Sequence, residues 1–343
     1  MSRSILVTGV AGFIGSHTAA ALLARGDRVL GLDNLNSYYD PARKEDNIRL
    51  LRETAASGQF HFRKGDIRDR ELLQSLFRDE SIDAVAHLAA MAGVRSSIND
   101  PGLYYDVNVN GTLALLDAAV GRLTPEVRRE RPPTFVFAST SSIYGATQVI
   151  PFIETDPGDK PMSPYAASKR AAELMGYTYH HLYQLHFTVL RFFTVYGPRG
   201  RPDMMAYKVM DNIFFDKETP LFNNGEMYRD WTYVDDIVQG IVAAVDRPLG
   251  YEIVNLGRGE PVLLADFVGL LEKLAGRKSK LTPAPMPDTD IPYTFADITK
   301  ARRLLGYAPA TPVAEGVRHL WQWYQQAILQ HPASAPSANC PGT

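Results

Sequence analysis

Tyr165 and Lys169 are spaced so that both side chains can act on the same bound molecule. Ser163 and Pro164 precede them as the N-cap and the first residue of an expected helix, in which residues four apart share a face. An ammonium group close to a phenol favours the phenolate, so we expect Lys169 to lower the pKa of Tyr165. The tyrosine would then be usable as a base near neutral pH. Amphipathic helices also carry such pairs for structural reasons, so the interpretation needs support from other residues.

That support comes from a run of hydroxyl side chains. Thr140, Ser141 and Ser142 directly follow an expected strand over residues 134–138. Parallel sheets of this kind bind their ligands at the C-terminal ends of the strands. The chain therefore holds a candidate general base together with hydroxyls that belong at the same edge of the sheet.

A glycine-rich turn near the N-terminus is the first element that must position this chemistry. Gly9, Gly12 and Gly15 follow an apolar run over residues 5–7, and a helical pattern begins at once. A strand that turns tightly into a helix directs free N–H groups and the positive end of the helix dipole at one point, which suits a pyrophosphate. Asp33 ends the second expected strand, at the distance typical of the acid that binds the adenosine ribose. A structural turn with a solvated aspartate is the alternative, but the combination favours a dinucleotide, and NAD over NADP.

Strand-like and helical segments alternate over the first 192 residues. The expected strands cover residues 5–7, 28–32, 60–64, 84–88, 134–138 and 187–192, and the expected helices cover 13–25, the stretch up to 52, 69–77, 101–120 and 164–183. This alternation predicts an α/β fold with a Rossmann-type, doubly wound parallel sheet covered on both faces. The segment 101–120 has apolar residues on more than one face, which indicates burial on two sides, such as at a subunit interface.

The pattern changes after residue 196, where Gly, Pro, Arg and Asn become frequent. The elements expected beyond this point are helices near 207–215, 235–245, 264–274 and 313–330 and a strand over 251–255, with a proline-rich crossing before the last helix. The expected organisation is a Rossmann domain over 1–196 with 234–256 returning to it, a smaller interleaved C-terminal lobe over 197–233 and 257–330, and a disordered tail over 331–343.

Composition excludes several classes of protein. The 343 residues are 45% hydrophobic and 22% charged, as in an ordinary soluble globular protein. A net charge near −2 without a long basic run argues against a nucleic-acid partner. The single Cys340 excludes a disulfide framework, and the eight histidines show no metal-ligand spacing, so no metal is expected. The early apolar run is only a strand long and nothing approaches a membrane span, so we expect a cytoplasmic protein.

Several short motifs follow one another in a fixed order along the chain. They are Thr8-Gly9-Val10-Ala11-Gly12-Phe13-Ile14-Gly15, His87-Leu88-Ala89-Ala90, Tyr144-Gly145, Tyr165-x-x-x-Lys169 and Arg229-Asp230. In these motifs the chain resembles the extended short-chain dehydrogenase/reductase family, from Ile5 to about Gln326. Within that family it is most similar to nucleotide-sugar 4-epimerases, and among these to UDP-glucuronate 4-epimerases. The stretches that carry this closer resemblance are Asp33–Pro41, Ala92–Arg95, Arg191–Pro198 and Gly200–Met204.

The resemblance implies roles for individual residues. Tyr165 would be the base and acid at the sugar O4, Thr140 would hydrogen-bond O4, and Lys169 would also hold the nicotinamide ribose of NAD. The residues implied to bind the cofactor are Gly9, Gly12, Phe13, Ile14, Gly15, Asp33, Asn34, Asp66, Ile67, Leu88, Ala89, Ala90, Tyr165 and Lys169. The residues expected to bind the UDP-sugar are Arg95, Thr140, Ser141, Ser142, Tyr165, Thr194, Arg201, Phe222, Asn223 and Arg229.

Within this set, Arg229 would bind the diphosphate, and Phe222 with Asn223 would hold the uracil. Arg95 and Arg201 could equally be surface charges, although both occur in loops where the substrate should lie. Two departures from the family pattern stand out: Thr140 replaces a serine, and residues 286–289 replace a stretch that usually offers Gln or Arg to the nucleotide.

Three classes of function remain open on these residues. The first is an isomerase that epimerises C4 of a UDP-sugar, either UDP-glucuronate or a UDP-glucose type of substrate. The second is a lyase such as a UDP-glucuronate decarboxylase, and the third is a sensor without chemistry. The related lyases carry an acid at the positions of Ser141 or Ser142, and serine cannot act as a carboxylate acid or base, so the first class is favoured. The resemblance also implies a homodimer through the helices at 101–120 and 164–183.

Overall fold

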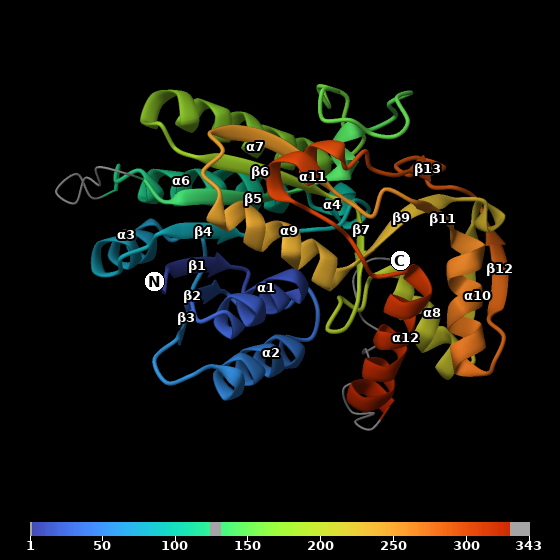
Figure 1. Ribbon diagram of the computed structural model, residues 1–343. Helices are drawn as coiled ribbons and strands as arrows, with labels where there is room; N and C mark the ends of the chain where they lie inside the picture. The colour runs from blue at the N-terminus through green and yellow to red at the C-terminus, as the bar shows by residue number, and fades with distance from the viewer. Residues whose placement is uncertain (1, 124–131, 330–343) are drawn as a thin grey trace.

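A central parallel sheet with helices on both faces occupies one side of the molecule, and a smaller group of strands and helices occupies the other (Figure 1). The computed structural model describes residues 2–123 and 132–329. The tail expected to be disordered over 331–343 lies outside the described residues.

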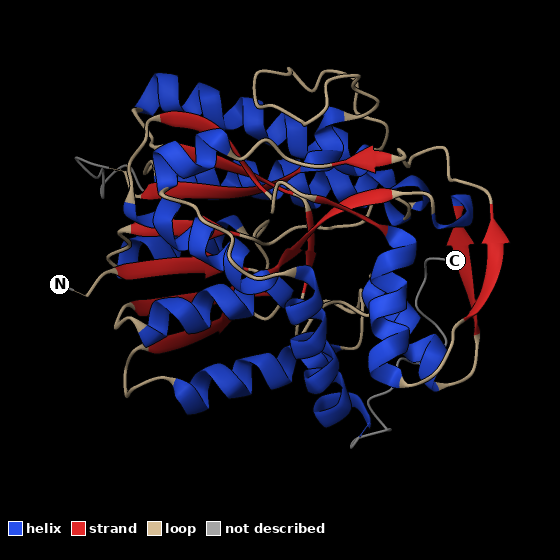
Figure 2. Cartoon of the chain, turned by 45° about the vertical axis from the view of Figure 1, so that its right-hand side comes forward, coloured by secondary structure: helices blue, strands red, loops and turns tan. Residues whose placement is uncertain are grey.

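The central sheet has seven strands in the order β10-β6-β5-β4-β1-β2-β3, and every neighbouring pair is parallel (Figure 2). The strands are β1 (Ser4–Thr8), β2 (Arg28–Asp33), β3 (Phe60–Lys64), β4 (Ala84–His87), β5 (Thr134–Thr140), β6 (Phe187–Phe192) and β10 (Tyr251–Leu256). The strand order reverses at β1 and β4, which is where doubly wound sheets open a crevice for a ligand. The predicted fold class is therefore confirmed.

Alternate side chains of β1 belong to the two separate cores of the sheet. Ile5 and Val7 lie in the core beneath one helical layer, and Leu6 lies in the core beneath the other. One layer contains α1 (Phe13–Ala24), α2 (Pro41–Thr54) and α9 (Val234–Asp246), and the other contains α3 (Arg70–Asp79), α6 (Thr112–Ala119) and α7 (Pro164–Tyr183). Burial of each such side chain stabilises the fold by about 1.5–3 kcal/mol, which accounts for the run of apolar residues in the strand.

The segment over 101–120, expected to be one helix, is divided in the structure. It consists of α5 (Pro101–Tyr105), a π-helical turn (Asp106–Gly111) and α6. Within the wide turn, the Asn108 amide donates to the carbonyl of Met91 at 2.9 Å and accepts from its N–H at 2.9 Å. A β-carbon on Gly111 would lie 2.7 Å from Cδ1 of Ile67, so the turn also packs closely against the loop after β3. The extra residue of the π turn is what directs Asn108 inward.

Strands are more frequent in the smaller part than the sequence indicated. β7 (Thr194–Tyr196), β9 (Tyr228–Tyr233), β11 (Pro261–Leu263) and β13 (Tyr293–Thr294) form one sheet, and β8 (Glu218–Phe222) pairs with β12 (Lys280–Ala284). The helices of the smaller part are α8 (Met205–Phe214), α10 (Leu264–Ala275) and α12 (Val313–Tyr324), which a π-helical turn (Gln325–Leu329) extends. Two further helices pack on the larger part, α4 (Ser96–Asn99) against α5 and α7, and α11 (Thr299–Leu305) against α9 and β10. Part of the proline-rich crossing forms β12, because a strand with one neighbour tolerates Pro283.

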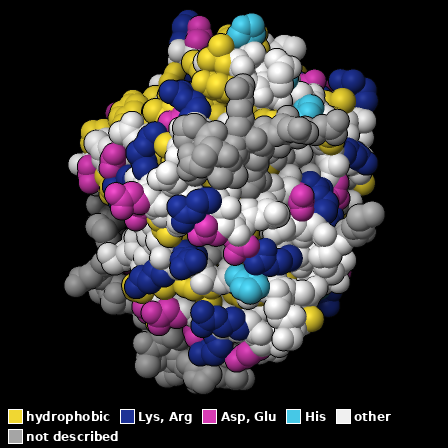
Figure 3. Space-filling model, turned by 90° about the vertical axis from the view of Figure 1, so that its left-hand side faces the viewer, with side chains coloured by type: hydrophobic (Ala, Val, Ile, Leu, Met, Phe, Trp, Pro, Cys, Tyr) yellow, Lys and Arg dark blue, Asp and Glu magenta, His cyan; other side chains and the backbone are white. Residues whose placement is uncertain are grey.

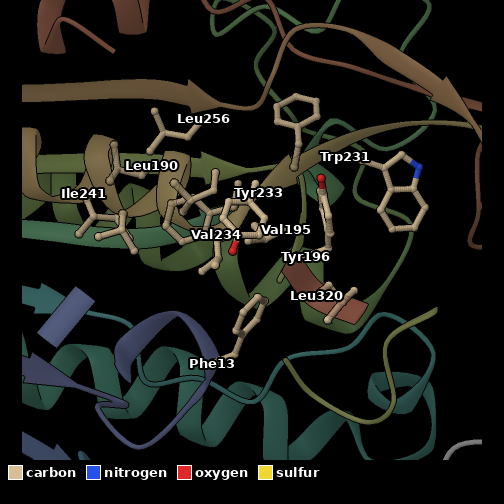
Figure 4. Close-up of a cluster of buried hydrophobic side chains, with 14 of the residues drawn as sticks. Phe13, Leu190, Val195, Tyr196, Trp231, Tyr233, Val234, Ile241, Leu256 and Leu320 are labelled. Carbon is tan, nitrogen blue, oxygen red and sulfur yellow. The ribbon is translucent and has the colours of Figure 1, made fainter. Parts of the chain in front are cut away.

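An aromatic cluster joins the two parts of the molecule (Figure 4). The indole of Trp231 stacks on Phe267 with ring centroids 3.8 Å apart, and Tyr196 meets both rings edge-on. Phe13 from the first turn of α1 and Leu320 from α12 belong to the same core. The start of α1, and with it the glycine turn, is therefore packed against the smaller part.

Charged side chains of both signs are interspersed on the face of the molecule shown in Figure 3. Among the described residues, no helix combines the length and the hydrophobicity needed to cross a membrane.

Two helical glycines provide a test of this packing. A β-carbon on Gly176 of α7 would overlap the ring of Phe187 on β6, so Gly176→Ala should lower the free energy of unfolding by about 1–3 kcal/mol. Gly269 of α10 has open space around it, so Gly269→Ala is the matched control and should leave stability unchanged or raise it by about 0.5–1 kcal/mol. Urea denaturation measures both variants, and equal stability would contradict the proposed packing.

Candidate active site

A cavity of about 570 Å³ opens at the C-terminal edge of the central sheet. Of the residues predicted to form the site, those that line it are Gly9, Gly12, Phe13, Ile14, Gly15, Asp33, Asn34, Asp66, Ile67, Leu88, Ala89, Ala90, Thr140, Tyr165, Lys169 and Arg201. They come from the C-terminal ends of the five parallel strands β1 to β5, from the helix α7 and, for Arg201, from the loop after β7. Arg95, Ser141, Ser142, Thr194, Phe222, Asn223 and Arg229 lie outside this lining.

The glycine turn leaves space for a phosphate. Gly12 is the N-cap of α1 and offers no side chain to the first N–H groups of the helix. Gly9 has a φ of +70°, and a β-carbon there would lie 2.7 Å from the backbone nitrogen of Ala89. A β-carbon on Gly15 would overlap the carbonyl of Gly9. Side chains are thus excluded at Gly9 and Gly15, and a β-carbon on Gly12 would lie only 3.2 Å from the carbonyl oxygen of Gly9. The free N–H groups and the helix dipole suit a pyrophosphate.

Asp33 is held at the end of β2 by the backbone. Its carboxylate accepts the N–H of Ala11 at 3.0 Å and that of Leu35 at 2.9 Å. Burial raises the pKa of Asp33, and these two hydrogen bonds and the charge of Lys44 oppose the shift. Lys44, which sequence reasoning missed, donates to the carbonyl of Asn36 at 2.7 Å and thereby fixes the loop that follows Asp33.

Asp66 and Asn34 meet at the far end of the cavity. The Asn34 amide donates to Asp66 at 2.8 Å, and Arg68 forms an ion pair with the same carboxylate at 2.9 Å. The hydrogen bonds from Arg68 lower the pKa of Asp66 to about 2, so the group is a fixed acceptor beside Ile67. Arg68 is a second residue that the sequence did not single out.

Tyr165 and Lys169 lie on α7 as the spacing predicted. Ser163 accepts the N–H of Ala166 at 3.2 Å and caps the helix. The ammonium of Lys169 is buried and donates to the carbonyl of Ala138 on β5 at 2.8 Å. Because of this desolvation the pKa of Lys169 falls to about 7, although the charge of Glu173 opposes the shift.

The expectation that Lys169 lowers the pKa of Tyr165 was wrong. Burial raises the pKa of Tyr165, and the positive charge of Arg201 and the hydroxyl of Thr140 are what oppose this shift. Arg201 itself forms a two-pronged ion pair with Asp203, at 2.9 and 3.0 Å. The cation that acts on the phenol therefore comes from a distant loop, which no helical spacing could indicate.

Of the predicted hydroxyls, that of Thr140 acts directly on the phenol of Tyr165. Thr140 donates to Ser142 at 3.1 Å, and Ser142 with Ser141 begins the short 3₁₀ helix Ser141–Tyr144. Thr194 starts β7 and lines a separate apolar cavity of about 100 Å³. The ring of Tyr104 meets the ring of Tyr165 edge-on at 6.2 Å.

The remaining predicted residues gather at the outer end of the site. The guanidinium of Arg95 lies 4.3 Å from the centre of the Phe222 ring and donates to Asp290 at 3.2 Å. Arg229 forms an ion pair with the same carboxylate at 3.7 Å. The side chain of Asn223 instead bonds within its own turn, where its amide donates to the carbonyl of Glu226. Asp290, which joins the two arginines, was missed by sequence reasoning even though it adjoins the unusual stretch at 286–289.

Two buried polar residues beneath the cavity had no role predicted from the sequence, although His87 begins one of the motifs. His87 lies between the hydroxyls of Thr8 at 2.7 Å and Thr112 at 3.0 Å, and burial lowers its pKa to about 3, so the imidazole is neutral. Asn108 of the π-helical turn donates to Ser168 of α7 at 3.0 Å. A polar side chain in an otherwise apolar segment was the available signal for both residues.

The parallel sheet, the glycine turn with Asp33 and the buried Tyr–Lys pair together define an extended short-chain dehydrogenase/reductase. The chain belongs to the GDP-mannose 4,6 dehydratase family, whose model matches residues 6–320.

The known proteins that this chain is similar to include enzymes named for different reactions. The chain is 44% identical to the UDP-glucuronate 4-epimerase of Thermodesulfobacterium geofontis, over 94% of this chain and 96% of that protein. The crystal structure of a Bacillus cereus UDP-glucuronic acid 4-epimerase with UDP-glucuronic acid and NAD superposes with a TM-score of 0.84 at 33% identity, covering 94% of this chain and 99% of the other. A dTDP-glucose 4,6-dehydratase from Streptomyces venezuelae with NAD bound also has a TM-score of 0.84, at 30% identity, covering 96% and 98%.

The surroundings of Asp33 predict selectivity for NAD. A 2′-phosphate would place negative charge against a carboxylate that the backbone holds in position, so the stripped protein should bind NAD about a hundredfold more tightly than NADP. Asp33→Ser should reduce the ratio of NAD affinity to NADP affinity. Asp46→Ser, at an exposed position paired with Arg49, should leave that ratio unchanged. Isothermal titration calorimetry measures the affinities. Equal or tighter binding of NADP by the unaltered protein would refute the role of Asp33.

Proposed function

We propose that the protein is an NAD-dependent UDP-glucuronate 4-epimerase, which interconverts UDP-glucuronate and UDP-galacturonate through a transient 4-keto sugar. The observation that carries this proposal is the grouping of Thr140, Tyr165 and Lys169 beside the glycine turn, with hydroxyls and no carboxylate at Ser141 and Ser142. The relatives named UDP-glucuronate 4-epimerase support the same assignment over nearly the whole chain.

In this proposal Tyr165 moves one proton. It takes the proton from the O4 hydroxyl when C4 is oxidised and returns it when C4 is reduced on the opposite face. NAD, held at the glycine turn and Asp33, would supply the acceptor and then the donor of the C4 hydride, so the reaction would have no net redox change. Thr140 hydrogen-bonds O4, and Lys169, anchored on Ala138, holds the nicotinamide ribose. The charge of Arg201 favours the phenolate of Tyr165 and so offsets part of the cost of its burial.

Retention of the sugar carboxylate separates this activity from a decarboxylase. A 4-keto hexuronate loses CO₂ when the C5–carboxylate bond lies perpendicular to the carbonyl plane, because the breaking bond then overlaps the π system. In the proposed site, Ser141, Ser142 and Thr194 hydrogen-bond the carboxylate and keep it away from that angle. Each hydrogen bond to a charged group contributes about 1.5–3 kcal/mol, so two or three of them would bias the rotamer strongly.

The outer end of the site is proposed to hold UDP. Arg229 and Arg95 would bind the diphosphate, and Phe222 would contact the uracil. Asp290 orients both guanidinium groups. In this arrangement the Rossmann domain, residues 1–196 with 234–256, binds NAD and supplies the residues at O4, and the lobe over 197–233 and 257–330 completes the UDP-sugar site.

Incubation of the purified protein with UDP-glucuronate tests the proposal. We expect UDP-galacturonate as the product, identified by chromatography and mass spectrometry, with the carboxyl carbon retained. Tyr165→Phe should lower kcat by about a hundredfold or more with UDP-sugar binding preserved, which assigns the turnover to this site. A UDP-pentose as the main product would establish a decarboxylase, and activity confined to UDP-glucose would show that the hydroxyls serve a neutral hydroxymethyl group.

We also propose a homodimer formed by α7 and the α5–α6 segment. Large apolar side chains on α7 point to solvent, with Leu174 52%, Tyr177 54% and Leu182 60% exposed, and Tyr105 of α5 is 43% exposed. Such residues on adjacent helices form a surface of the kind that mediates association. A symmetric pairing of the two helical segments with their copies would cover them.

Light scattering at micromolar concentration should therefore give the mass of a dimer. Leu174→Lys should shift the mass towards the monomer, because it places a charge in the buried contact. Leu281→Lys is the control, since this leucine of β12 is 40% exposed but remote from α7 in the fold. A monomeric mass for the unaltered protein would rule out the proposed dimer.

A further inference from the structure

Glu173 is a fully buried carboxylate one helical turn beyond Lys169, with a side-chain exposure of 0%. One of its oxygens accepts the hydroxyl of Ser139 at 2.6 Å and Nε of Arg191 at 3.0 Å. The other oxygen accepts Nη2 of Arg191 at 2.8 Å and Nη1 of Arg170 at 3.0 Å. A single carboxylate therefore binds α7, β5 and β6 together.

This junction lies directly under the residues proposed for catalysis. Ser139 immediately precedes Thr140 on β5 and is paired in register with Arg191 on β6. Glu173 shares its helix with Tyr165 and Lys169. Its contact with Ser139 thus sets the distance between the strand that carries Thr140 and the helix that carries Tyr165.

Arg191 extends the junction to the neighbouring hydroxyls. Its guanidinium lies 4.6 Å from the centre of the Tyr144 ring, and Tyr144 ends the 3₁₀ helix that begins with Ser141. The phenol of Tyr144 in turn donates to Asn255 on β10 at 2.6 Å. Stability alone does not explain such a buried ion pair, because apolar residues of similar volume often stabilise a core equally well.

Glu173 also supplies charge to the surroundings of Lys169. The elements packed around that ammonium carry the titratable or charged residues Tyr165, Arg170 and Glu173 on α7, His87 on β4 and Arg191 on β6, of which Glu173 and His87 interact with it. Burial lowers the pKa of Lys169 to about 7, and the carboxylate of Glu173 is the charge that opposes this shift. Of these groups, Glu173 is the one that stabilises the charged form of Lys169.

We propose that Glu173, clamped by Arg191 and Ser139, is a positioning residue that fixes Thr140 against Tyr165 and keeps Lys169 charged during turnover. This inference rests on the proposed epimerase function.

Removal of the carboxylate charge has a defined effect on pH dependence. Without Glu173 the pKa of Lys169 falls further, so the ammonium is lost at a lower pH. The alkaline limb of the kcat profile should move down by about one pH unit, the size expected for a charge one helical turn away in a partly screened interior. A purely structural role would lower the amount of folded enzyme and leave the limb in place.

The double variant Glu173→Gln/Arg191→Met is the main test. It removes both charges of the ion pair, so neither Glu173 nor Arg191 remains as a buried charge without the other. We expect a tenfold or greater loss of kcat, the downward shift of the alkaline limb, and the same shift in the NMR titration of Lys169. That titration uses ¹³C-labelled lysine in the NAD-loaded protein without sugar, and the Lys169→Met spectrum identifies the signal. Glu173→Asp retains the charge, so the pKa of Lys169 in this variant should lie within a few tenths of a pH unit of its value in the unaltered protein.

Asp117→Asn is the matched control. Asp117 is a buried carboxylate that accepts the phenol of Tyr179, farther along α7, and pairs with Arg70 at 2.9 Å. Its loss should lower thermal stability without moving the Lys169 titration or the alkaline limb.

An unchanged titration and profile in the double variant would overturn the inference. Absence of epimerase activity in the unaltered protein would refute the proposed function, whereas the titration of Lys169 would still report on Glu173. If the double variant does not fold, Ser139→Ala carries the test, because it removes one hydrogen bond and no charge. A fivefold or greater loss of kcat with an unchanged titration would support positioning, and an unchanged kcat would refute it.

Discussion

The close approach of two backbone segments at Gly9 is the contact on which the cavity depends. With a β-carbon 2.7 Å from the nitrogen of Ala89, no side chain could occupy this position without separating β1 from the loop after β4. Those two strands are neighbours in the parallel sheet, at the point where the strand order reverses. Because all strands of the sheet run in one direction, their C-terminal ends share one edge, and the glycine turn, Asp33, Ala89 and Thr140 meet there.

Buried charge is the second feature that distinguishes this edge of the sheet. Lys169 donates to a backbone carbonyl, Glu173 pairs with Arg191, and the partly buried Arg201 pairs with Asp203. Charges removed from water require such partners, and their interactions are stronger in the less polar interior than in solvent. Burying these charges lowers the stability of the fold, and the site in return contains polar groups that are already oriented. In the proposed reaction, the charge of Arg201 would favour the transient negative charge on Tyr165 and so offset part of the cost of burying it.

The fold by itself does not select the reaction. A UDP-glucuronic acid 4-epimerase and a dTDP-glucose 4,6-dehydratase superpose on the chain with the same TM-score of 0.84. The choice therefore depends on side chains grafted onto the shared scaffold. Residues 140–142 form the most informative stretch, because hydroxyls can orient a carboxylate but cannot exchange a proton with a carbon atom as an acid can. Our proposal of an epimerase that retains its carboxylate rests on that difference.

Local patterns in the sequence were sufficient for much of the architecture. Apolar runs predicted the seven parallel strands, the glycine spacing predicted the turn at Gly9, and a spacing of four placed Tyr165 and Lys169 on one helix. These features depend on residues that are close together in the chain, so their physical causes can be read there. Only the tertiary structure decided what distant segments do to one another. It brought Asp290 between Arg95 and Arg229, widened the helix at Asn108 into a π turn, and paired the short strands of the smaller part. It also reversed the expected pKa shift of Tyr165, because burial and the charge of Arg201 arise from packing and are invisible in local spacing.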